Sequence, residues 1–354
     1  MLLWLALATA LVLLLAAAAG QYLVWPARRD VGPAPADIGA RSVSIQFGHR
    51  QHAAGWLCHG TGNVGAVLLL HEMRGDRRSM LARLRFLSAQ GFSVLAIDLP
   101  GHGESDGQCI TLGHREALAA AAALDYLAHE CDGQPLAVIG VSLGGAALLL
   151  ANTRPQPSVV ILESVFPTLV QAAMNRLRHT MGPLAPVVAP LMFVQLPFRF
   201  GISHRKLRPI AKVAQWDCAT LVIGGRNDRE TTEAETQALF DACNGPKQLW
   251  LIDGAIHEDL HVYAGAAYEA KVTTFLKQHL ARARPGAAQA TQATQATRAT
   301  QATRATQATR ATQANQVARA LQTTQATRTT PAAQPQTTVM VATVQPTENI
   351  GIGL

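Results

Sequence analysis

The sequence predicts an α/β fold in which a doubly wound, mostly parallel sheet carries a helical insertion. Short, continuous apolar runs alternate with helical segments along residues 41–284, and this alternation is typical of parallel strands joined by crossover helices. Polar residues directly follow the carboxyl ends of several of these runs. Because ligands and catalytic groups gather at that edge of open parallel sheets, the sequence favours a single domain with its chemistry along one sheet edge.

The expected strands and helices follow one another from residue 41 onward. Strands are expected at residues 41–47, 66–70, 92–97, 136–139, 159–162, 220–223 and 248–252, and a turn at 57–65. Helices are expected at residues 79–90, 115–129, 232–242 and 263–280 and directly after Ser142. Residues 41–47 alternate, with Val43, Ile45 and Phe47 on one face, whereas runs such as 66–70 are continuously apolar, which indicates strands buried on both faces.

The composition agrees with a large buried core. Hydrophobic residues make up 49% of the 354 residues and charged residues 15%, which excludes a wholly disordered chain. The net charge of +7 comes from scattered basic residues without a basic stripe interleaved with aromatics, so nucleic acid is not an expected partner. The five cysteines include no C-x-x-C pair, which favours free thiols over a disulfide framework or a structural zinc site.

The first 25 residues are expected to anchor the chain in a membrane. Leu2 to Val24 carry no charge and exceed the roughly 20 residues that cross a bilayer. No Lys or Arg precedes this run, which favours an uncleaved single-pass anchor over a cleaved signal sequence, the alternative. Arg28 and Arg29 follow, so the positive-inside rule favours a cytoplasmic body, with an exported or periplasmic one as the alternative. Residues 26–40 are expected to form a linker.

Residues 135–150, PLAVIGVSLGGAALLL, contain a strand, a sharp turn and a helix with Ser142 at the apex. So tight a turn leaves no room for bulky side chains two residues before and after the serine, which explains Gly140 and Gly144. The turn lifts the hydroxyl above the sheet edge and points the first N–H groups of the helix at whatever the serine attacks. The pattern predicts that Ser142 is a nucleophile.

A serine hydroxyl needs a base to take its proton and a carboxylate to orient that base. His257 is the expected base, because it follows the last strand on a glycine-containing loop. Asp228, at the end of the preceding strand, is the expected acid, and Glu163 is the alternative acid. The chain order Ser142, Asp228, His257 is the order that this kind of sheet requires.

Five motifs together resemble the alpha/beta-hydrolase superfamily. They are VLLLHEMRG (67–75), DLPGHGESDG (98–107), GVSLGG (140–145), GGRND (224–228) and GAIH (254–257). The resemblance covers about residues 41–282 and implies a cap-bearing serine hydrolase of the esterase, lipase or peptidase kind. It implies Ser142 as nucleophile, Asp228 as acid and His257 as base, with no metal or cofactor.

A tetrahedral intermediate also needs about two N–H donors for its oxyanion. The residue after the nucleophile, Leu143, is expected to supply one, and Met73, after the 66–70 strand, the other. Members of the superfamily usually carry His-Gly after this strand, whereas Glu72 stands here. A carboxylate at that place opposes an oxyanion unless it points away, so the role of Met73 depends on how Glu72 is held.

Residues 166–216 interrupt the alternation and are rich in Leu, Val, Met and Pro. In the resembling superfamily this position holds a cap over the active site, and packing onto the core is the alternative. An apolar cap favours an apolar acyl or alkyl group. Together with the membrane anchor, it makes a lipid-like carboxylic ester or thioester the leading substrate.

Other interpretations remain open. A catalytically silent binding protein, an acyltransferase and a cofactor-free haloperoxidase would all fit the same fold. The segment HEDLH (257–261) matches the zinc motif H-E-x-x-H, but it starts on a loop rather than inside a helix, so no metal is expected. From residue 285 onward, Gln-Ala-Thr and Arg-Ala-Thr triplets predict a disordered low-complexity tail.

Overall fold

The structure, a computed structural model, describes residues 1–283, and the predicted tail lies outside the described residues. Its main sheet has eight strands in the order β10-β9-β8-β7-β4-β5-β3-β2, and all neighbours from β10 to β5 are parallel. The strands of this sheet are β2 (Arg41–Phe47), β3 (Gln51–Cys58), β4 (Ala66–Leu70), β5 (Ser93–Ile97), β7 (Leu136–Val141), β8 (Val159–Glu163), β9 (Ala219–Gly225) and β10 (Lys247–Ile252). The predicted fold class is therefore confirmed.

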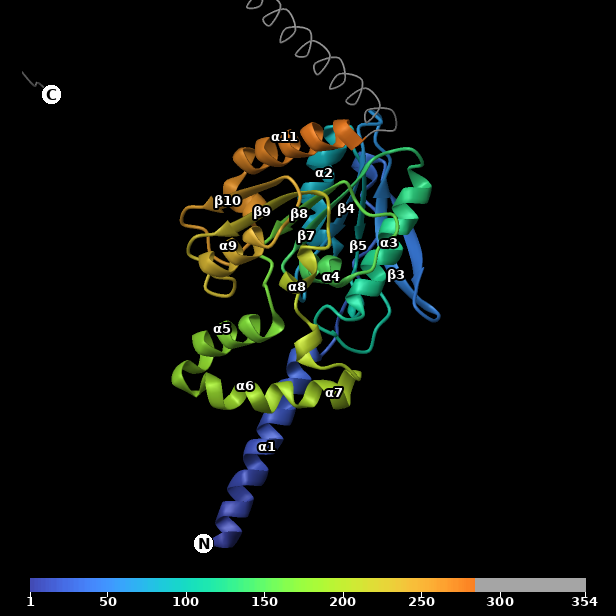
Figure 1. Cartoon of the computed structure of the whole chain (residues 1–354). Helices are drawn as coiled ribbons and strands as arrows, with labels where there is room; N and C mark the ends of the chain where they lie inside the picture. Colours follow the sequence, from blue (N-terminus) through green and yellow to red (C-terminus); the bar gives the residue numbers. More distant parts are fainter. Residues whose placement is uncertain (284–354) are drawn as a thin grey trace, which may run out of the picture. The chain divides into compact units, whose positions relative to one another are not determined.

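Helices cover both faces of this sheet (Figure 1). One face carries α3 (Glu116–Glu130), α4 (Leu143–Leu150) and α9 (Glu233–Asp241), and the other carries α2 (Leu81–Ala89) and α11 (Ala266–Ala283). Alternate residues of each central strand serve the two layers: Leu68 of β4 packs in the first core and Val67 in the second. Burial on both faces explains why the strand runs are continuously apolar.

The structure differs from the expected elements in two places. Strand β3 was not expected, and it extends to Cys58, inside the predicted turn at 57–65. Its sequence, QHAAGWLC, shows no clear alternation; the strand forms because it pairs antiparallel with both β2 and β5. The expected final helix is divided into α10 (Leu260–Ala264) and α11 at Gly265, whose φ of 49° ends the first helix.

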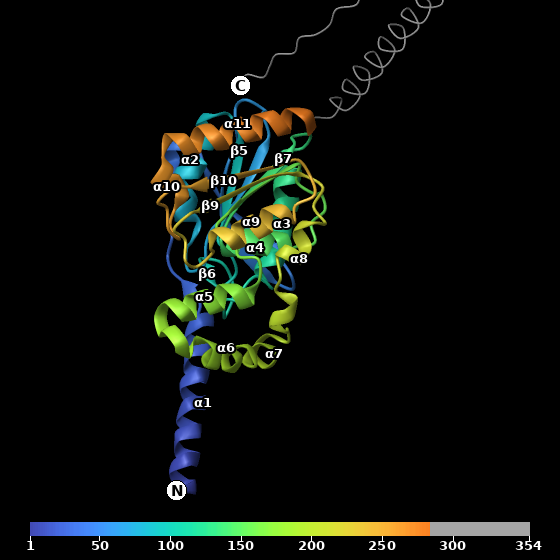
Figure 2. The ribbon, with the colours of Figure 1, turned by 60° about the vertical axis from the view of Figure 1, so that its left-hand side comes forward.

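The insertion between β8 and β9 folds into four helices. They are α5 (Leu169–Met181), α6 (Ala185–Phe193), α7 (Gln195–Phe200) and α8 (Ile210–Val213). Helices α5 to α7 lie at the same end of the sheet as α1 (Leu2–Val24) in both views (Figures 1 and 2). The insertion thus covers the edge at which the parallel strands end.

By length and composition, two described segments are apolar enough to cross a membrane, namely α1 and residues 169–200. The residues after α1, expected to be a linker, lie against the domain. The short strand β1 (Ala27–Arg28) pairs with β6 (His102–Gly103), and the N–H groups of Val31 and Gly32 donate to the Glu104 carboxylate. These bonds hold the segment that follows α1 against the domain.

Candidate active site

The turn at Ser142 is as tight as its sequence predicts. Ser142 joins β7 to α4 with φ 46° and ψ −109°, a backbone conformation that costs a non-glycine residue about 1–3 kcal/mol. Its N–H donates to the carbonyl oxygen of Glu163 at 2.8 Å. A Cβ on Gly140 would lie 2.6 Å from the Cα of Gly145, and one on Gly144 would overlap the carbonyl oxygen of Leu70. Only glycine therefore fits on either side of the serine.

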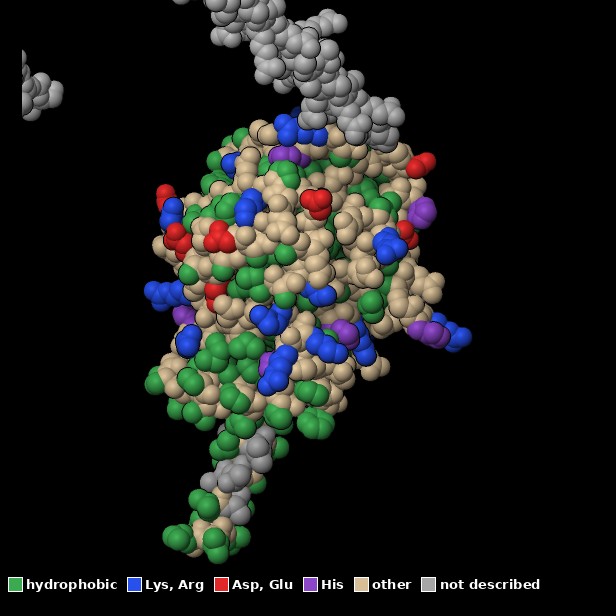
Figure 3. Space-filling model, viewed as in Figure 1, with side chains coloured by type: hydrophobic (Ala, Val, Ile, Leu, Met, Phe, Trp, Pro, Cys, Tyr) green, Lys and Arg blue, Asp and Glu red, His purple; other side chains and the backbone are tan. Residues whose placement is uncertain are grey.

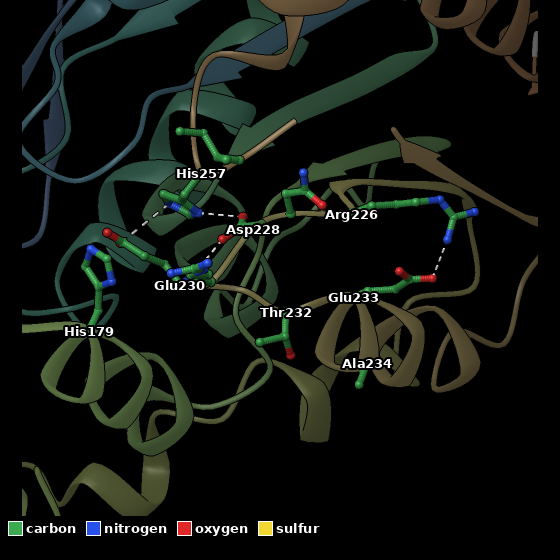
Figure 4. A pocket seen from close by; sticks show the side chains of 11 residues that line it. His179, Arg226, Asp228, Glu230, Thr232, Glu233, Ala234 and His257 are labelled. Carbon is green, nitrogen blue, oxygen red and sulfur yellow. Dashed lines mark hydrogen bonds and ion pairs between the residues drawn. The ribbon is translucent and has the colours of Figure 1, made fainter. Parts of the chain in front are cut away.

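His257 and Asp228 form a hydrogen-bonded pair at the ends of β10 and β9 (Figure 4). His257 Nδ1 lies 2.8 Å from Asp228 Oδ2. The other carboxylate oxygen, Oδ1, accepts the N–H groups of Glu230 and Thr231, both at 2.8 Å. The Asp228 side chain is wholly buried, and these three bonds hold its charge and direction.

The pair sets the protonation of the imidazole. Burial, the largest single effect, lowers the pKa of His257, but the hydrogen bond and charge of Asp228 together with the charge of Glu230 raise it more, so the net pKa lies above the ordinary value of 6.5. Because Nδ1 donates to Asp228, Nε2 of the neutral ring is the atom left to accept a proton. That is the arrangement that a general base requires.

Ser142 and His257 line the same cavity, of about 230 Å³, together with Leu143 and Met73. Most of the other walls are apolar: Leu23, Leu112, Phe166, Leu169, Ala172 and Ala173. In the described part of the chain, the Ser142 hydroxyl is not hydrogen-bonded to the imidazole ring of His257. In catalytic sites without a ligand, the hydrogen bond between nucleophile and base is often long. A wider cleft of about 890 Å³ adjoins the cavity at His257 and Glu230 (Figure 4).

The sequence motifs did not single out Glu230 or Arg176, two charged residues that line this cavity. Glu230 Oε2 lies 4.0 Å from Nε2 of His257 and 3.7 Å from Nη1 of Arg176 on α5, and its negative charge adds to the raised pKa of His257. The only sequence signal for Glu230 was its place two residues after Asp228. Glu230 therefore connects the insertion electrostatically with the proposed base.

The loop after β4 is held by a buried histidine. His71 Nδ1 lies 2.6 Å from the carbonyl oxygen of Glu72, and its Nε2 accepts the N–H of Leu99 at 2.9 Å. Burial lowers the pKa of His71 to about 4, so the ring is neutral and Nδ1 donates. In a trans peptide the C=O and N–H point in opposite directions. Holding the Glu72 carbonyl toward His71 therefore points the Met73 N–H the other way.

The Glu72 side chain folds back over its own turn. Its Oε2 accepts the Ser79 hydroxyl at 3.0 Å, and a Cβ on Gly75 would overlap its Oε1. Burial raises the pKa of the Glu72 carboxyl. Although Glu72 lines the cavity, its carboxyl group is held over Gly75 by Ser79, and a carboxylate turned toward its own turn repels an oxyanion less than one that points into the cavity.

The alternative acid, Glu163, lies elsewhere. It is fully buried, pairs with Arg83 at 2.7 Å and accepts the hydroxyl of Tyr268. The same Arg83 guanidinium contacts Asp259 at 2.7 Å, two residues beyond His257. The structure thus brings Asp228, and not Glu163, to the imidazole, while the Glu163–Arg83 pair supports the loop that carries it.

The two histidines of HEDLH have separate partners. His257 faces Asp228, whereas His261, in α10, lies 3.1 Å from Glu269 of α11. Asp259, between them, accepts the N–H groups of His261 and Val262 and so caps α10. The motif therefore crosses a loop-to-helix boundary instead of presenting both rings on one helix face, as the zinc motif requires.

This chain has the features that define the alpha/beta hydrolases: their sheet order, a tight turn at a serine and an insertion between β8 and β9. The sequence profile of the alpha/beta hydrolase family matches residues 57–271, and the chain belongs to this family. The fold and the family support a hydrolase activity.

Individual relatives are distant. The chain is 22% identical over 222 residues to YqkD of Bacillus subtilis, covering 62% of this chain and 72% of that protein. It is 31% identical over 98 residues to the caffeoylshikimate esterase of Arabidopsis thaliana, covering 26% and 30%. The esterase Pf2001 of Pyrococcus furiosus has a similar structure, with a TM-score of 0.60 and 22% identity over 73% of this chain and 100% of that one. At this identity the structural likeness shows the fold.

Replacing Asp228 with Asn should lower the pKa of His257. The substitution removes the negative charge that raises this pKa, while burial, which lowers it, remains. The measurement is an NMR titration of the His257 ring in the full chain. Asp253→Asn is the control, because the Asp253 side chain is 89% exposed and pairs with Arg226. An unchanged His257 pKa in Asp228→Asn would contradict the assigned pair.

Glu163→Gln should destabilise the chain by about 3 kcal/mol, because it removes the buried partner of Arg83 and leaves this buried guanidinium with only the partly exposed carboxylate of Asp259. Urea unfolding followed by circular dichroism measures this loss. Glu269→Gln, whose side chain is 47% exposed, should cost less than about 1 kcal/mol. An unchanged midpoint with abolished turnover would instead favour Glu163 as the orienting acid.

Proposed function

We propose that this chain is a serine hydrolase that cleaves a carboxylic ester or thioester with an apolar acyl group. The observation that carries the proposal is one cavity lined by both the strained Ser142 turn and the His257–Asp228 pair. Acyl transfer through a serine needs three parts: a hydroxyl nucleophile, a base whose Nε2 can accept a proton, and a buried carboxylate behind that base. No metal or cofactor is required for this chemistry.

The proposed reaction has two halves. His257 Nε2 takes the proton of Ser142 as Oγ bonds to the carbonyl carbon, and the N–H groups of Leu143 and Met73 stabilise the oxyanion. The imidazolium, stabilised by Asp228, then protonates the leaving alcohol or thiol as its bond to the acyl carbon breaks. In the second half His257 takes a proton from a water molecule as the water oxygen bonds to the acyl carbon. The imidazolium then returns this proton to Ser142 Oγ as the bond between Oγ and the acyl carbon breaks, which releases the acid.

The walls of the cavity support the choice of acyl group. The cavity of Ser142 is lined mainly by Leu, Phe, Met and Ala side chains, and apolar walls favour an apolar ligand. The adjoining wider cleft is lined by charged and polar groups, among them Arg226, Glu230 and Glu233. We therefore assign the acyl chain to the cavity and the more polar leaving group to the cleft.

The second candidate, a catalytically silent binding protein, rests on Glu72. An ionised carboxylate beside the Met73 N–H would oppose an oxyanion, and this side chain lines the cavity. The hydrogen bond from Ser79 and the position of the carboxyl group over Gly75 favour the hydrolase instead.

We also propose that α1 is an uncleaved single-pass membrane anchor, with the rest of the chain on the cytoplasmic side or, alternatively, exported.

Ser142→Ala should abolish labelling by a fluorophosphonate probe and lower ester hydrolysis by about 10⁴-fold or more, because the nucleophile is lost. The measurements are in-gel labelling and turnover of a panel of esters of increasing acyl length. Ser44→Ala, on an exposed face of β2, is the control. Equal labelling of wild type and Ser142→Ala, or a strict preference for acetyl esters, would contradict the proposal.

The kcat/KM profile should rise with pH through the raised pKa of His257, above 6.5, because only the neutral ring accepts the serine proton. Glu230→Gln removes a charge that raises this pKa, so the acid limb should move to lower pH. Glu233→Gln, in the same cleft but paired with Arg226, serves as the control and should leave the limb in place. Movement in the opposite direction would contradict the role given to Glu230.

A further inference from the structure

The outer face of the insertion is apolar and exposed. Four apolar side chains are 58, 68, 58 and 87% exposed: Leu184 just before α6, Val187 in α6, Val194 between the two helices and Phe198 in α7. Because the backbone of Val194 is also helical, their spacing places them on one side of this segment, which we call the α6–α7 face. Ala185, Ala189 and Leu196 are buried on the other side. These two helices thus show apolar side chains both inward and outward, and large exposed apolar faces mark interaction surfaces.

This segment does not cross a membrane by itself. Residues 169–200 are apolar enough to do so, and only 17% of their most apolar window is buried. However, Gly182, with φ 56°, turns the chain between α5 and α6, and α6 and α7 run crosswise to α1 in both views (Figures 1 and 2). The geometry is that of helices lying in the plane of a surface that α1 enters.

Helix α1 is hydrogen-bonded to α7 at defined positions along its length. Gln195 Nε2 donates to the carbonyl oxygen of Ala16 at 3.0 Å, and Arg199 Nη2 donates to that of Ala17, also at 3.0 Å. A Cβ on Gly20 would lie 2.5 Å from Gln195 Oε1, so α1 and α7 approach closely. The membrane position of α1 therefore also determines that of α6 and α7.

The charges agree with a lipid surface. The sequence between Glu163 and Asp217 contains seven Lys and Arg residues and no Asp or Glu. Arg178, Arg205, Lys206 and Arg208 are exposed, and Lys and Arg side chains gather where the apolar lower end of the molecule meets the body (Figure 3). Basic residues at this level would face the headgroups, and anionic lipids attract them.

We propose that the α6–α7 face formed by Leu184, Val187, Val194 and Phe198 docks onto the lipid bilayer that α1 enters, in the same leaflet. Leu23, near the end of α1, lines the cavity of Ser142, so this docking brings the cavity to the membrane surface. The inference about the substrate rests on the proposed function. The substrate is an ester of a membrane lipid, and it reaches Ser142 from the bilayer.

Photocrosslinking of the full chain tests the docking. Phe198 is replaced with photoreactive benzoylphenylalanine, and the protein is reconstituted in vesicles of phosphatidylcholine and phosphatidylglycerol that retain it through a carbonate wash. Val262, 75% exposed on α10, is the matched control position. We expect at least tenfold more lipid adduct, measured by mass spectrometry, at position 198. Equal adducts at both positions, or a main adduct with a second copy of this chain, would overturn the docking.

A second measurement tests delivery of the substrate. For each variant, the hydrolysis rate of a long-chain ester embedded in these vesicles is divided by that of a water-soluble short-chain ester. Phe198→Asp should lower this ratio about tenfold, and Val262→Asp should keep the wild-type ratio. An unchanged ratio in Phe198→Asp overturns delivery from the bilayer. If wild type hydrolyses neither ester, the proposed function fails, whereas the crosslinking result still decides the docking.

Discussion

The close approach of the Ser142 turn to the ends of β4 and β8 is the constraint on which the site depends. Helix α4 starts so near β4 that Gly144 has no room for a side chain, and the Ser142 N–H is bonded to the Glu163 carbonyl oxygen at 2.8 Å. These contacts hold a strained backbone that a free turn would relax. The hydroxyl is thereby positioned before any ligand arrives, which reduces the entropic cost of reaching the reactive geometry.

Buried charges then determine where the imidazole sits. Asp228 is buried but bonded at both oxygens, to His257 and to two backbone N–H groups. On the other side of the loop, Arg83 contacts both Glu163 and Asp259. Burying charge costs several kcal/mol per ion unless the partners are complete. Each group is therefore stable in only one arrangement, and that arrangement directs the His257 ring into the cavity.

The inner and outer sides of the insertion between β8 and β9 have different roles. Its inner side supplies Phe166, Leu169 and Arg176 to the cavity, and Arg176 also meets Glu230 beside His257. Its outer side is apolar because, in our proposal, it faces lipid rather than water. Gln195 and Arg199 donate hydrogen bonds to carbonyl oxygens of α1. In our proposal these contacts couple the position of α1 in the bilayer to the position of the insertion over Ser142.

The sequence by itself determined the features that depend on neighbours along the chain. The apolar runs predicted the parallel sheet, Gly140 and Gly144 predicted the tight turn, and the order of Ser142, Asp228 and His257 matched the topology. Only the tertiary structure decided which residues meet across the sheet. In the folded chain Asp228, rather than Glu163, is bonded to His257, and Glu230 lies beside the same ring. The tertiary structure also pairs β3 with β5, places the Glu72 side chain over Gly75 and packs α1 against α7. Such choices depend on distances between residues far apart in sequence, which local periodicity does not encode.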